Sequence, residues 1–320
     1  MSRSHFLPRL SLLALAVVLA GCEKPQPVEP VAPPAEPDPV TTVAAAPAVA
    51  QPADPLAAAL AGAHRSDANK ARDAWRHPQE TLAFFGFKPT ATVIEVTPGG
   101  GWYTEVLAPA LKGQGTLVAA IVDPASATSD GAKAYYERGN TAFNEKLKLA
   151  GDVYGDVQVR TFSATAPSFG DDESADLVLT FRNVHNWLGS DTADAMFQGF
   201  FKVLKPGGTL GVVEHRAQPG SKAAGDAESG YMTEEAVIAL ATAAGFELAE
   251  KSEINANPKD TADHPNGVWT LPPSLRVPDG EDAEKYKAIG ESDRMTLRFT
   301  KPRGDEILKQ GMDQAPANGD

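Results

Sequence analysis

The sequence predicts a doubly wound α/β fold, and three observations lead to that prediction. From residue 65 onward, runs with helical periodicity alternate with short apolar runs rich in β-branched residues, the pattern of helices alternating with strands. A glycine cluster, 99–101, stands between the first apolar run and the helix that follows it. The proline and glycines of segment 205–208 close a later helix just before the next strand. One domain of ordinary size accounts for the chain after its first sixty residues.

The N-terminus, residues 1–21, has the three parts of a secretion signal. Two arginines supply the positive start, and the apolar run 10–20 is too short for a membrane span. The last part, Leu19-Ala20-Gly21-Cys22, resembles the lipobox of bacterial lipoproteins, in which the cysteine is lipidated and becomes the new N-terminus. Glu23, rather than aspartate, follows Cys22, as in lipoproteins passed on to the outer membrane. We therefore expect lipidation of Cys22 and anchoring at the periplasmic face of the outer membrane.

A proline-rich segment follows the cysteine. Residues 23–62 contain ten prolines and many alanines, and such a composition cannot bury enough surface to offset its ordering entropy. We therefore predict a disordered tether over 22–62, a globular domain over 63–303 and a flexible tail over 304–320.

Within the domain, two short helices are expected first, over 66–76 and 79–85. Apolar, β-branched runs predict strands at 91–96, 116–123, 157–162, 175–181, 209–214, 246–253 and 294–300. Longer helices are expected between them at 103–111, 131–150, 191–204 and 233–244. Asp191 is placed as the N-cap of the third of these. Residues 254–293 lack a clear pattern and are rich in proline, and a stretch this long predicts a lid or binding loop.

Charge and cysteine content exclude several classes of function. The formal net charge is −13, and removal of residues 1–21 with their two arginines makes it −15. Such a surface repels phosphate backbones, so neither nucleic acid nor a polybasic contact with lipid is expected as a partner. Cys22 is the single cysteine, which excludes an intrachain disulfide, a cysteine-ligated zinc site and a thiol nucleophile in the domain.

Polar and glycine residues that suit cofactor binding follow three of the predicted strands. Glu95 lies near the end of the first strand, which runs into the segment 99–103, where glycines let a ligand approach the backbone. Asp123 ends the second strand, where a carboxylate can accept hydrogen bonds from two ribose hydroxyls. The fourth strand ends in FRNVHNW, 181–187, and LKPGG, 204–208, precedes the fifth. Together and in this order, these features resemble class I S-adenosylmethionine-dependent methyltransferases.

The resemblance covers about residues 65–303. The chain is identified as a member of a group of predicted exported methyltransferases that share PGGGWYTE, FRNVHNW, SEINANPKDT, GVWTLPP and ESDRMTLRF. Membership implies a Rossmann-like sheet of strand order 3-2-1-4-5-7-6 with strand seven antiparallel. It also implies in-line methyl transfer from S-adenosylmethionine to an unidentified small molecule. The cofactor-binding residues that it implies are Glu95, Gly99, Gly100, Gly101, Tyr103, Asp123 and Asn183.

Two histidines are the candidate catalytic residues. His185 and His215 follow the fourth and fifth strands, and the carboxyl ends of parallel strands open into one crevice. If the acceptor is an acid, a side chain must take its proton, and histidine suits this role because its unperturbed pKa lies near 6.5. The competing interpretation is that His185 is a hydrogen-bonded packing residue lining the cofactor site.

The candidate substrate and lid residues are Trp187, His264 and Trp269. Strand six runs parallel to the first five and strand seven is antiparallel, so segment 254–293 leaves and re-enters the sheet at the cofactor edge. We therefore expect it to cover the acceptor pocket with His264 or Trp269 facing His185; the alternative is a loop that shields the sheet edge. No metal site is predicted, because the histidines lack close ligand spacing.

Two other functions stay open at this point. A ligand-binding envelope lipoprotein could keep the fold without turnover, since S-adenosylmethionine is made in the cytoplasm and, being charged, does not cross the inner membrane unaided. A nicotinamide oxidoreductase is disfavoured because Thr104 occupies the third glycine position of the G-x-G-x-x-G fingerprint. The partners expected are a small-molecule acceptor and, through the lipid anchor alone, a membrane.

Overall fold

The computed structural model describes residues 54–127, 129–221 and 228–304. The predicted signal, Cys22, most of the tether and the tail beyond residue 304 lie outside these ranges. In the part of the chain described, no helix is both long enough and apolar enough to span a bilayer.

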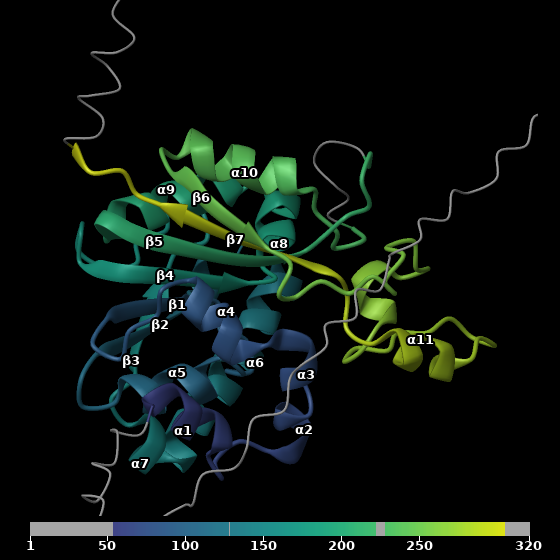
Figure 1. The fold of residues 1–320 in the computed structure, drawn as a ribbon, viewed down its shortest axis with the longest axis horizontal. Coiled ribbons are helices and arrows are strands. Elements are labelled where there is room, and N and C mark those ends of the chain that lie inside the picture. The colour runs from purple at the N-terminus through teal and green to yellow at the C-terminus, as the bar shows by residue number, and fades with distance from the viewer. Residues whose placement is uncertain (1–53, 128, 222–227, 305–320) are drawn as a thin grey trace, which may run out of the picture. The chain divides into compact units, whose positions relative to one another are not determined.

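Seven strands form one mixed sheet in the order β3-β2-β1-β4-β5-β7-β6 (Figure 1). They are β1 (Thr92–Val96), β2 (Thr116–Val122), β3 (Gln158–Phe162), β4 (Ala175–Phe181), β5 (Leu204–His215), β6 (Glu247–Ser252) and β7 (Arg294–Thr300). The first five pair in parallel, and β7 is antiparallel to both β5 and β6. The predicted fold class is confirmed, including the strand order and the reversed seventh strand.

Helices cover both faces of the sheet. One face packs against α4 (Pro78–Phe84) and α5 (Thr104–Leu111), and α1 (Pro55–Ala61) and α7 (Gly151–Tyr154) pack on α5. The other packs against α8 (Val184–Gly189), α9 (Ala193–Val203) and α10 (Glu234–Ala243). The remaining helices are α2 (Asp67–Lys70), α3 (Asp73–Arg76), η1 (Pro124–Ser126), α6 (Asp130–Leu149), η2 (Gly267–Thr270) and α11 (Ala283–Ile289).

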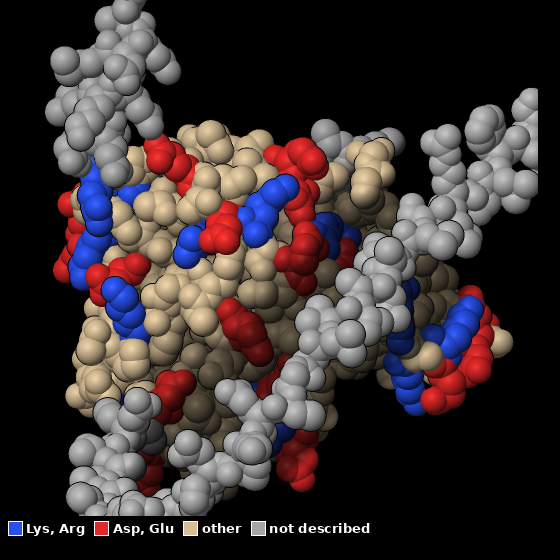
Figure 2. Space-filling view, viewed as in Figure 1, with Lys and Arg blue, Asp and Glu red and all other residues tan. Residues whose placement is uncertain are grey.

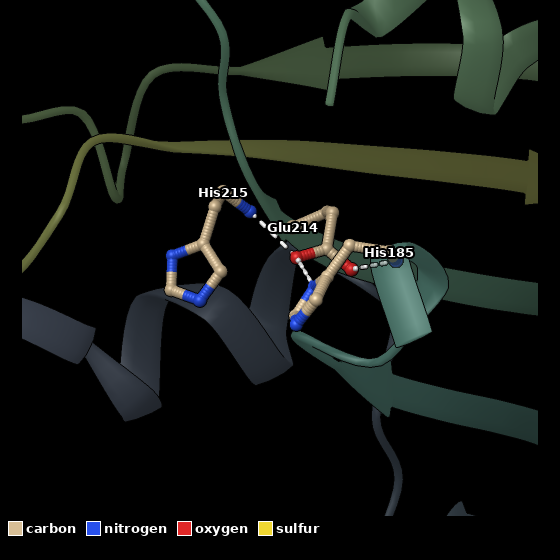
Figure 3. Close-up of side chains that lie close together, drawn as sticks. All are labelled: His185, Glu214 and His215. Carbon is tan, nitrogen blue, oxygen red and sulfur yellow. Dashed lines mark hydrogen bonds and ion pairs between the residues drawn. The ribbon is translucent and has the colours of Figure 1, made fainter. Parts of the chain in front are cut away.

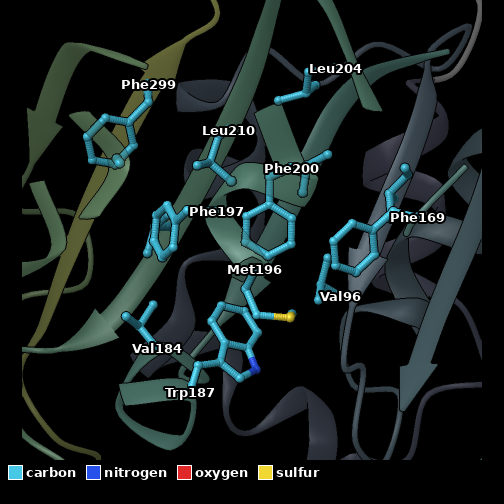
Figure 4. Packing of buried hydrophobic residues seen from close by; sticks show 14 of the residues in the cluster. Val96, Phe169, Val184, Trp187, Met196, Phe197, Phe200, Leu204, Leu210 and Phe299 are labelled. Carbon is cyan, nitrogen blue, oxygen red and sulfur yellow. The ribbon is translucent and has the colours of Figure 1, made fainter. Parts of the chain in front are cut away.

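Alternation along the strands explains this two-sided burial. Val93 and Leu177 belong to the cluster under α1, α4 and α5, whereas their neighbours Ile94 and Val178 belong to the cluster under α9 and α10. Successive strand side chains point to opposite faces, so strands that are apolar on both faces must be covered twice. Figure 4 shows the second cluster, in which aromatic rings of α9 fill the space above the sheet.

The globular unit begins earlier than the sequence suggested. Residues 55–61, assigned above to the tether, form α1, which starts at Pro55 after the side-chain cap of Asp54. Leu56 and Ala59 are buried, which fixes this helix to the domain. The single helix expected over 66–76 is two short helices, α2 and α3.

The region after β4 also departs from expectation. Residues 184–189 form α8, a helix that was not expected from the sequence. Asp191 is not an N-cap: it has φ 55°, and α9 starts at Ala193 after Thr192, which makes no side-chain cap. Residues 205–208, expected as a turn, belong to β5, where the pairing with β4 shifts register.

Segment 254–293 is a folded insertion that contains η2 and α11. Asp260 holds it together, because its carboxylate accepts hydrogen bonds from the Tyr231 hydroxyl, from His264 and from the backbone N–H of Asp293. Asn257 donates to the carbonyls of Ile289 and Glu291. In Figure 1 the insertion stands beyond the end of the sheet where β7 begins, with α11 away from the strands.

Candidate active site at the carboxyl edge of the sheet

The turn after β1 is held on one side and open on the other. Gly99 and Gly101 have φ of 58° and 72°, a region that side-chain-bearing residues rarely adopt. Lys146 of α6 donates to the carbonyls of Gly100 and Gly101 at 2.8 and 3.3 Å. A Cβ added at Gly100 would meet no atom within 4 Å. The turn therefore presents open backbone to a ligand on the side away from Lys146.

Two adjoining cavities share this turn, with Thr97, Pro98, Gly99, Gly100 and Tyr135 in both walls. The first, the histidine cavity, has a volume of about 380 Å³ and is also lined by Glu95, Tyr103, Arg182, His185, His215 and Trp269. The second, the α6 cavity, has about 400 Å³ and is also lined by Ile121, Val122, Tyr136, Asn140 and Phe143. Each lies in the range of about 300–1,000 Å³ that is usual for small-molecule sites.

Glu95 is a buried carboxyl at the back of the histidine cavity. Burial raises its pKa to about 7, and the hydrogen bond from Thr104 Oγ1, 2.6 Å long, opposes this rise together with Lys146. Near neutral pH the group is therefore divided between its acid and its carboxylate forms.

His185 is fixed by a buried glutamate. Glu214 Oε2 accepts hydrogen bonds from the backbone N–H of Val184 and of His185, and Oε1 accepts one from the N–H of His215. The fourth contact is His185 Nδ1, 3.0 Å from Oε1 (Figure 3). Since a carboxylate that receives three N–H bonds acts as an acceptor, Nδ1 carries the proton, and Nε2 is the nitrogen that can accept one. Residue 214 thereby sets both the start of α8 and the tautomer of His185.

His215 lies beside His185, with 5.5 Å between the ring centroids. Its Nδ1 is 2.5 Å from Ser292 Oγ. Burial lowers the pKa of His215 well below its ordinary value, and His185 and nearby arginines lower it further. His215 is therefore neutral at physiological pH, which makes it a polar wall of the cavity, whereas His185 has the orienting carboxylate.

The structure separates the three predicted lid residues. Trp269 of η2 lines the histidine cavity, edge-on to His185 at 5.9 Å between centroids, which is where the topology argument expects it. His264 does not face His185: its Nε2 is 2.8 Å from Asp260 Oδ1 and its ring packs on Tyr286. Trp187 does not reach the cavity either, because α8 turns it into the core against Phe200 (Figure 4).

The predicted cofactor residues also differ in placement. Tyr103 lines the histidine cavity and stacks on Phe181, with 3.5 Å between the ring centroids. Asn183 lines it too, with its amide nitrogen donating to the Val96 carbonyl and to Thr180. Asp123 lies outside both walls, although it directly follows Val122 of the α6 cavity, and its Oδ1 accepts the N–H of Ala125. Its contact with a ribose stays a prediction.

Sequence reasoning missed a group of arginines. Arg72, Arg76 and Arg182 all line the histidine cavity, and Arg294 stands behind them. Two of the four belong to motifs shared with the exported group, since FRNVHNW contains Arg182 and ESDRMTLRF contains Arg294 with its partner Glu291. Motif membership was the available signal; the spacing alone gave no indication that these residues converge.

Among the described residues, His185, Glu214 and His215 could offer ligand atoms to a metal ion, since these atoms lie within 4.8 Å of one another. Both oxygens of Glu214 already accept hydrogen bonds, including the one from His185 Nδ1. A metal would have to displace the contacts that hold α8, so this arrangement fits an orienting carboxylate better than a ligand set.

A larger hollow, of about 700 Å³, lies beside Arg216, away from the glycine turn. The Arg216 guanidinium donates to the carboxylates of Glu234, Glu253 and Asp293. Arg216 and these three carboxylates therefore satisfy one another. The candidate chemistry therefore lies in the two smaller cavities.

No protein-family model and no curated protein matches the chain. Its fold is similar to solved structures that include S-adenosylmethionine-dependent methyltransferases. One, from Aquifex aeolicus, is 16% identical with a TM-score of 0.47, over 72% of this chain and 93% of that one. The [4+2]-cyclase SpnF is 16% identical with a TM-score of 0.48, over 76% of this chain and 86% of that one. The glycopeptide N-methyltransferase MtfA is 13% identical with a TM-score of 0.45, over 74% of this chain and 100% of that one. Identities this low leave the activity to be argued from the chain's own residues.

Proposed function

We propose that this chain transfers a methyl group from S-adenosylmethionine to a small-molecule acceptor. The observation that carries the proposal is that the open glycine turn and the Glu214-held His185 line one cavity at the carboxyl edge of the sheet. In a doubly wound sheet this edge is where ligands bind. The cavity thus combines a place for a cofactor with a base.

Several residues fit the cofactor. The α6 cavity and the histidine cavity meet at Gly99 and Gly100, so an elongated molecule can lie across the turn and occupy both. Thr97 Oγ1 is buried without a hydrogen-bond partner among the described residues and belongs to both walls, which suits a polar ligand. Tyr135, which is 65% exposed and borders both cavities, can cover such a ligand from solvent.

When bound, S-adenosylmethionine supplies an electrophilic methyl group. His185 Nε2 would take the proton that an acidic acceptor gives up as its oxygen, nitrogen or sulfur bonds to the methyl carbon; the methyl–sulfur bond would break in the same step and S-adenosylhomocysteine would leave. Glu214 stabilises the imidazolium that results, because its carboxylate already receives the Nδ1 proton. Trp269 and Tyr103 confine the acceptor and exclude water from the reacting centre.

The size of the site favours a small acceptor. Neither cavity exceeds about 400 Å³, and the insertion covers the histidine cavity through Trp269. On the face drawn in Figure 2, acidic and basic side chains are interspersed rather than gathered into a basic groove. A metabolite or envelope constituent of low molecular mass is therefore the class of acceptor that we propose.

Methyl transfer is tested with labelled S-adenosylmethionine and the low-molecular-mass fraction of a cell extract. The full chain should place label in a small molecule and form S-adenosylhomocysteine one for one. His185→Gln should lower kcat by about 10²–10⁴-fold, the usual contribution of a positioned base. The affinity for S-adenosylhomocysteine should stay within about threefold, because the glycine turn is untouched.

His64→Gln is the matched control, since it makes the same change outside both cavities and outside the insertion, at a ring that hydrogen-bonds to the Glu105 carbonyl. It should turn over as the wild type does. Full turnover in His185→Gln would contradict the assignment of the base. Tight cofactor binding without transfer to any acceptor would contradict catalysis and support a ligand-binding lipoprotein.

We also propose that the chain is exported and lipidated at Cys22, on the strength of the signal-like residues 1–21. Cys22→Ser should abolish the lipid mass on the protein and move it from the membrane fraction to the soluble fraction. Mass spectrometry and fractionation of expressing cells measure both effects. Equal retention of wild type and variant in the membrane, with no lipid on either, would contradict lipidation.

A further inference from the structure

The histidine cavity carries more positive charge than the proposed reaction requires. Arg72 and Arg76 line it from one segment, and Arg182 joins them from a segment more than a hundred residues later in the chain. Arg294 adds a fourth guanidinium immediately behind them. Folding has thus gathered four cations at one place despite the mutual repulsion that this causes.

The carboxylates nearby do not balance them. Glu291 accepts hydrogen bonds from Arg72 Nε, Arg76 Nε and Arg294 Nη2 at 2.6, 3.2 and 2.5 Å. Glu214, which also faces Arg182, accepts hydrogen bonds from His185 and three backbone N–H groups and none from an arginine. Three of the four arginines therefore share one carboxylate, and the fourth, Arg182, donates to none.

Several of the guanidinium donors have no partner. Arg72 Nη2 and Arg76 Nη2 are buried without a hydrogen bond, and Arg76 as a residue is only 2% exposed. Arg182 is half-buried, and its guanidinium makes no hydrogen bond within the described part of the chain; desolvation together with Arg294 lowers its pKa to about 10. Buried donors of this strength normally meet an acceptor, and an anion at this wall would supply one.

We propose that Arg76, Arg182 and Arg72 form a subsite for an oxyanion, a carboxylate or phosphate group, carried by the methyl acceptor. The proposal rests on the function proposed above and names its substrate class. Planar guanidinium groups bind such oxyanions through paired N–H donors. The reacting atom of the acceptor would then lie between this subsite and His185.

Charge favours the acceptor over the cofactor as the source of the anion. The three arginines lie with His185 and Trp269 in the histidine cavity, which the proposed acceptor shares with part of the cofactor. The cofactor has one carboxylate but also an ammonium and a sulfonium, so its net charge of +1 adds to the excess. An anionic acceptor lowers the excess and attracts the sulfonium toward the same cavity.

The test titrates the full chain with inorganic phosphate and with acetate by calorimetry, with and without saturating S-adenosylhomocysteine. At least one anion should bind, and should bind also when S-adenosylhomocysteine is present. Arg182→Gln should weaken this binding by at least about tenfold, as expected for one lost charge-assisted contact. Arg72→Gln, at a more exposed position, should weaken it in the same direction and provides a second variant if Arg182→Gln does not fold.

Arg160→Gln is the control for charge alone, because it removes the same charge from the exposed face of β3 and should leave anion affinity unchanged. Binding of neither anion, or equal binding by all variants, would overturn the subsite. Competition between the anion and S-adenosylhomocysteine would assign the arginines to the cofactor carboxylate and overturn the proposal. Arginine-dependent anion binding in a chain that binds no S-adenosylhomocysteine would instead overturn the methyl-transfer function and leave the anion site standing.

Discussion

Replacing Glu291 by glutamine should lower the free energy of unfolding by about 3–5 kcal/mol at pH 7, the usual cost of breaking a buried ion pair from one side. Glu291 is 3% exposed and is the carboxylate that Arg72, Arg76 and Arg294 share. The glutamine keeps the volume but leaves these guanidinium groups repelling one another in a poorly solvated place. Urea denaturation of both proteins at pH 7 measures the difference.

Acid should reduce this difference. Burial alone would raise the pKa of Glu291, but Arg294, Arg76 and Arg72 outweigh it and lower the pKa from 4.5 to about 2. A carboxyl whose pKa is lower in the folded state stabilises the fold fully at pH values above its unfolded pKa. This stabilisation is lost as the pH falls from about 4.5 to about 2. The group contributes about 3 kcal/mol in total, since each tenfold change in proton affinity between the folded and unfolded states corresponds to about 1.4 kcal/mol. Wild type and Glu291→Gln should therefore converge on acidification.

Glu284→Gln serves as the control, because Glu284 lies exposed on α11 and pairs with Lys287 at the surface. An exposed ion pair contributes about 0–1 kcal/mol to the free energy of unfolding, so this variant should follow the wild type at pH 7 and on acidification. If Glu291→Gln were as stable as Glu284→Gln, the arginines would not depend on Glu291 for charge balance. The arginines would then have no excess positive charge for an anion to balance.

The sheet was predictable because its determinants are local. Each strand is a short apolar run bounded by turn residues, and patterns of this kind depend on neighbours in sequence. The order of the strands and the reversal of β7 came from resemblance to a family rather than from periodicity. The direction of β6 then followed from topology, and with it the edge at which the insertion containing Trp269 emerges.

The start of α8 was not predictable in the same way. Its first N–H groups are satisfied by Glu214, a side chain some thirty residues later in the chain. Asn183 stands at the N-cap position, but its side chain donates to Val96 and Thr180 instead of capping the helix, so the cap of α8 is not local. For the same reason Trp187 was assigned to the substrate pocket, although the helix turns it into the core.

Convergence of distant residues explains what else was missed. The arginine cluster joins α2–α3, the end of β4 and the start of β7, and its shared carboxylate Glu291 lies just before β7. Residues that come singly from separate elements have no spacing in the sequence that would show them to be neighbours. His264 was wrongly expected to face His185, because its hydrogen bond to Asp260, four residues earlier, keeps it out of the cavity.

The central claim, that the glycine turn binds the cofactor, is tested by the affinity of the full chain for S-adenosylhomocysteine in two leucine variants. Gly100 has an unstrained φ and open space around a Cβ, and it borders both cavities, so Gly100→Leu should fold and fill the cofactor's place. Gly131→Leu makes the same change in equally open space outside both walls. We expect calorimetry to show binding by the wild type and Gly131→Leu. Binding should be at least about tenfold weaker in Gly100→Leu, because the leucine side chain occupies space that we assign to the cofactor. Equal affinity of all three proteins, or no binding by the wild type at millimolar ligand, would contradict the account.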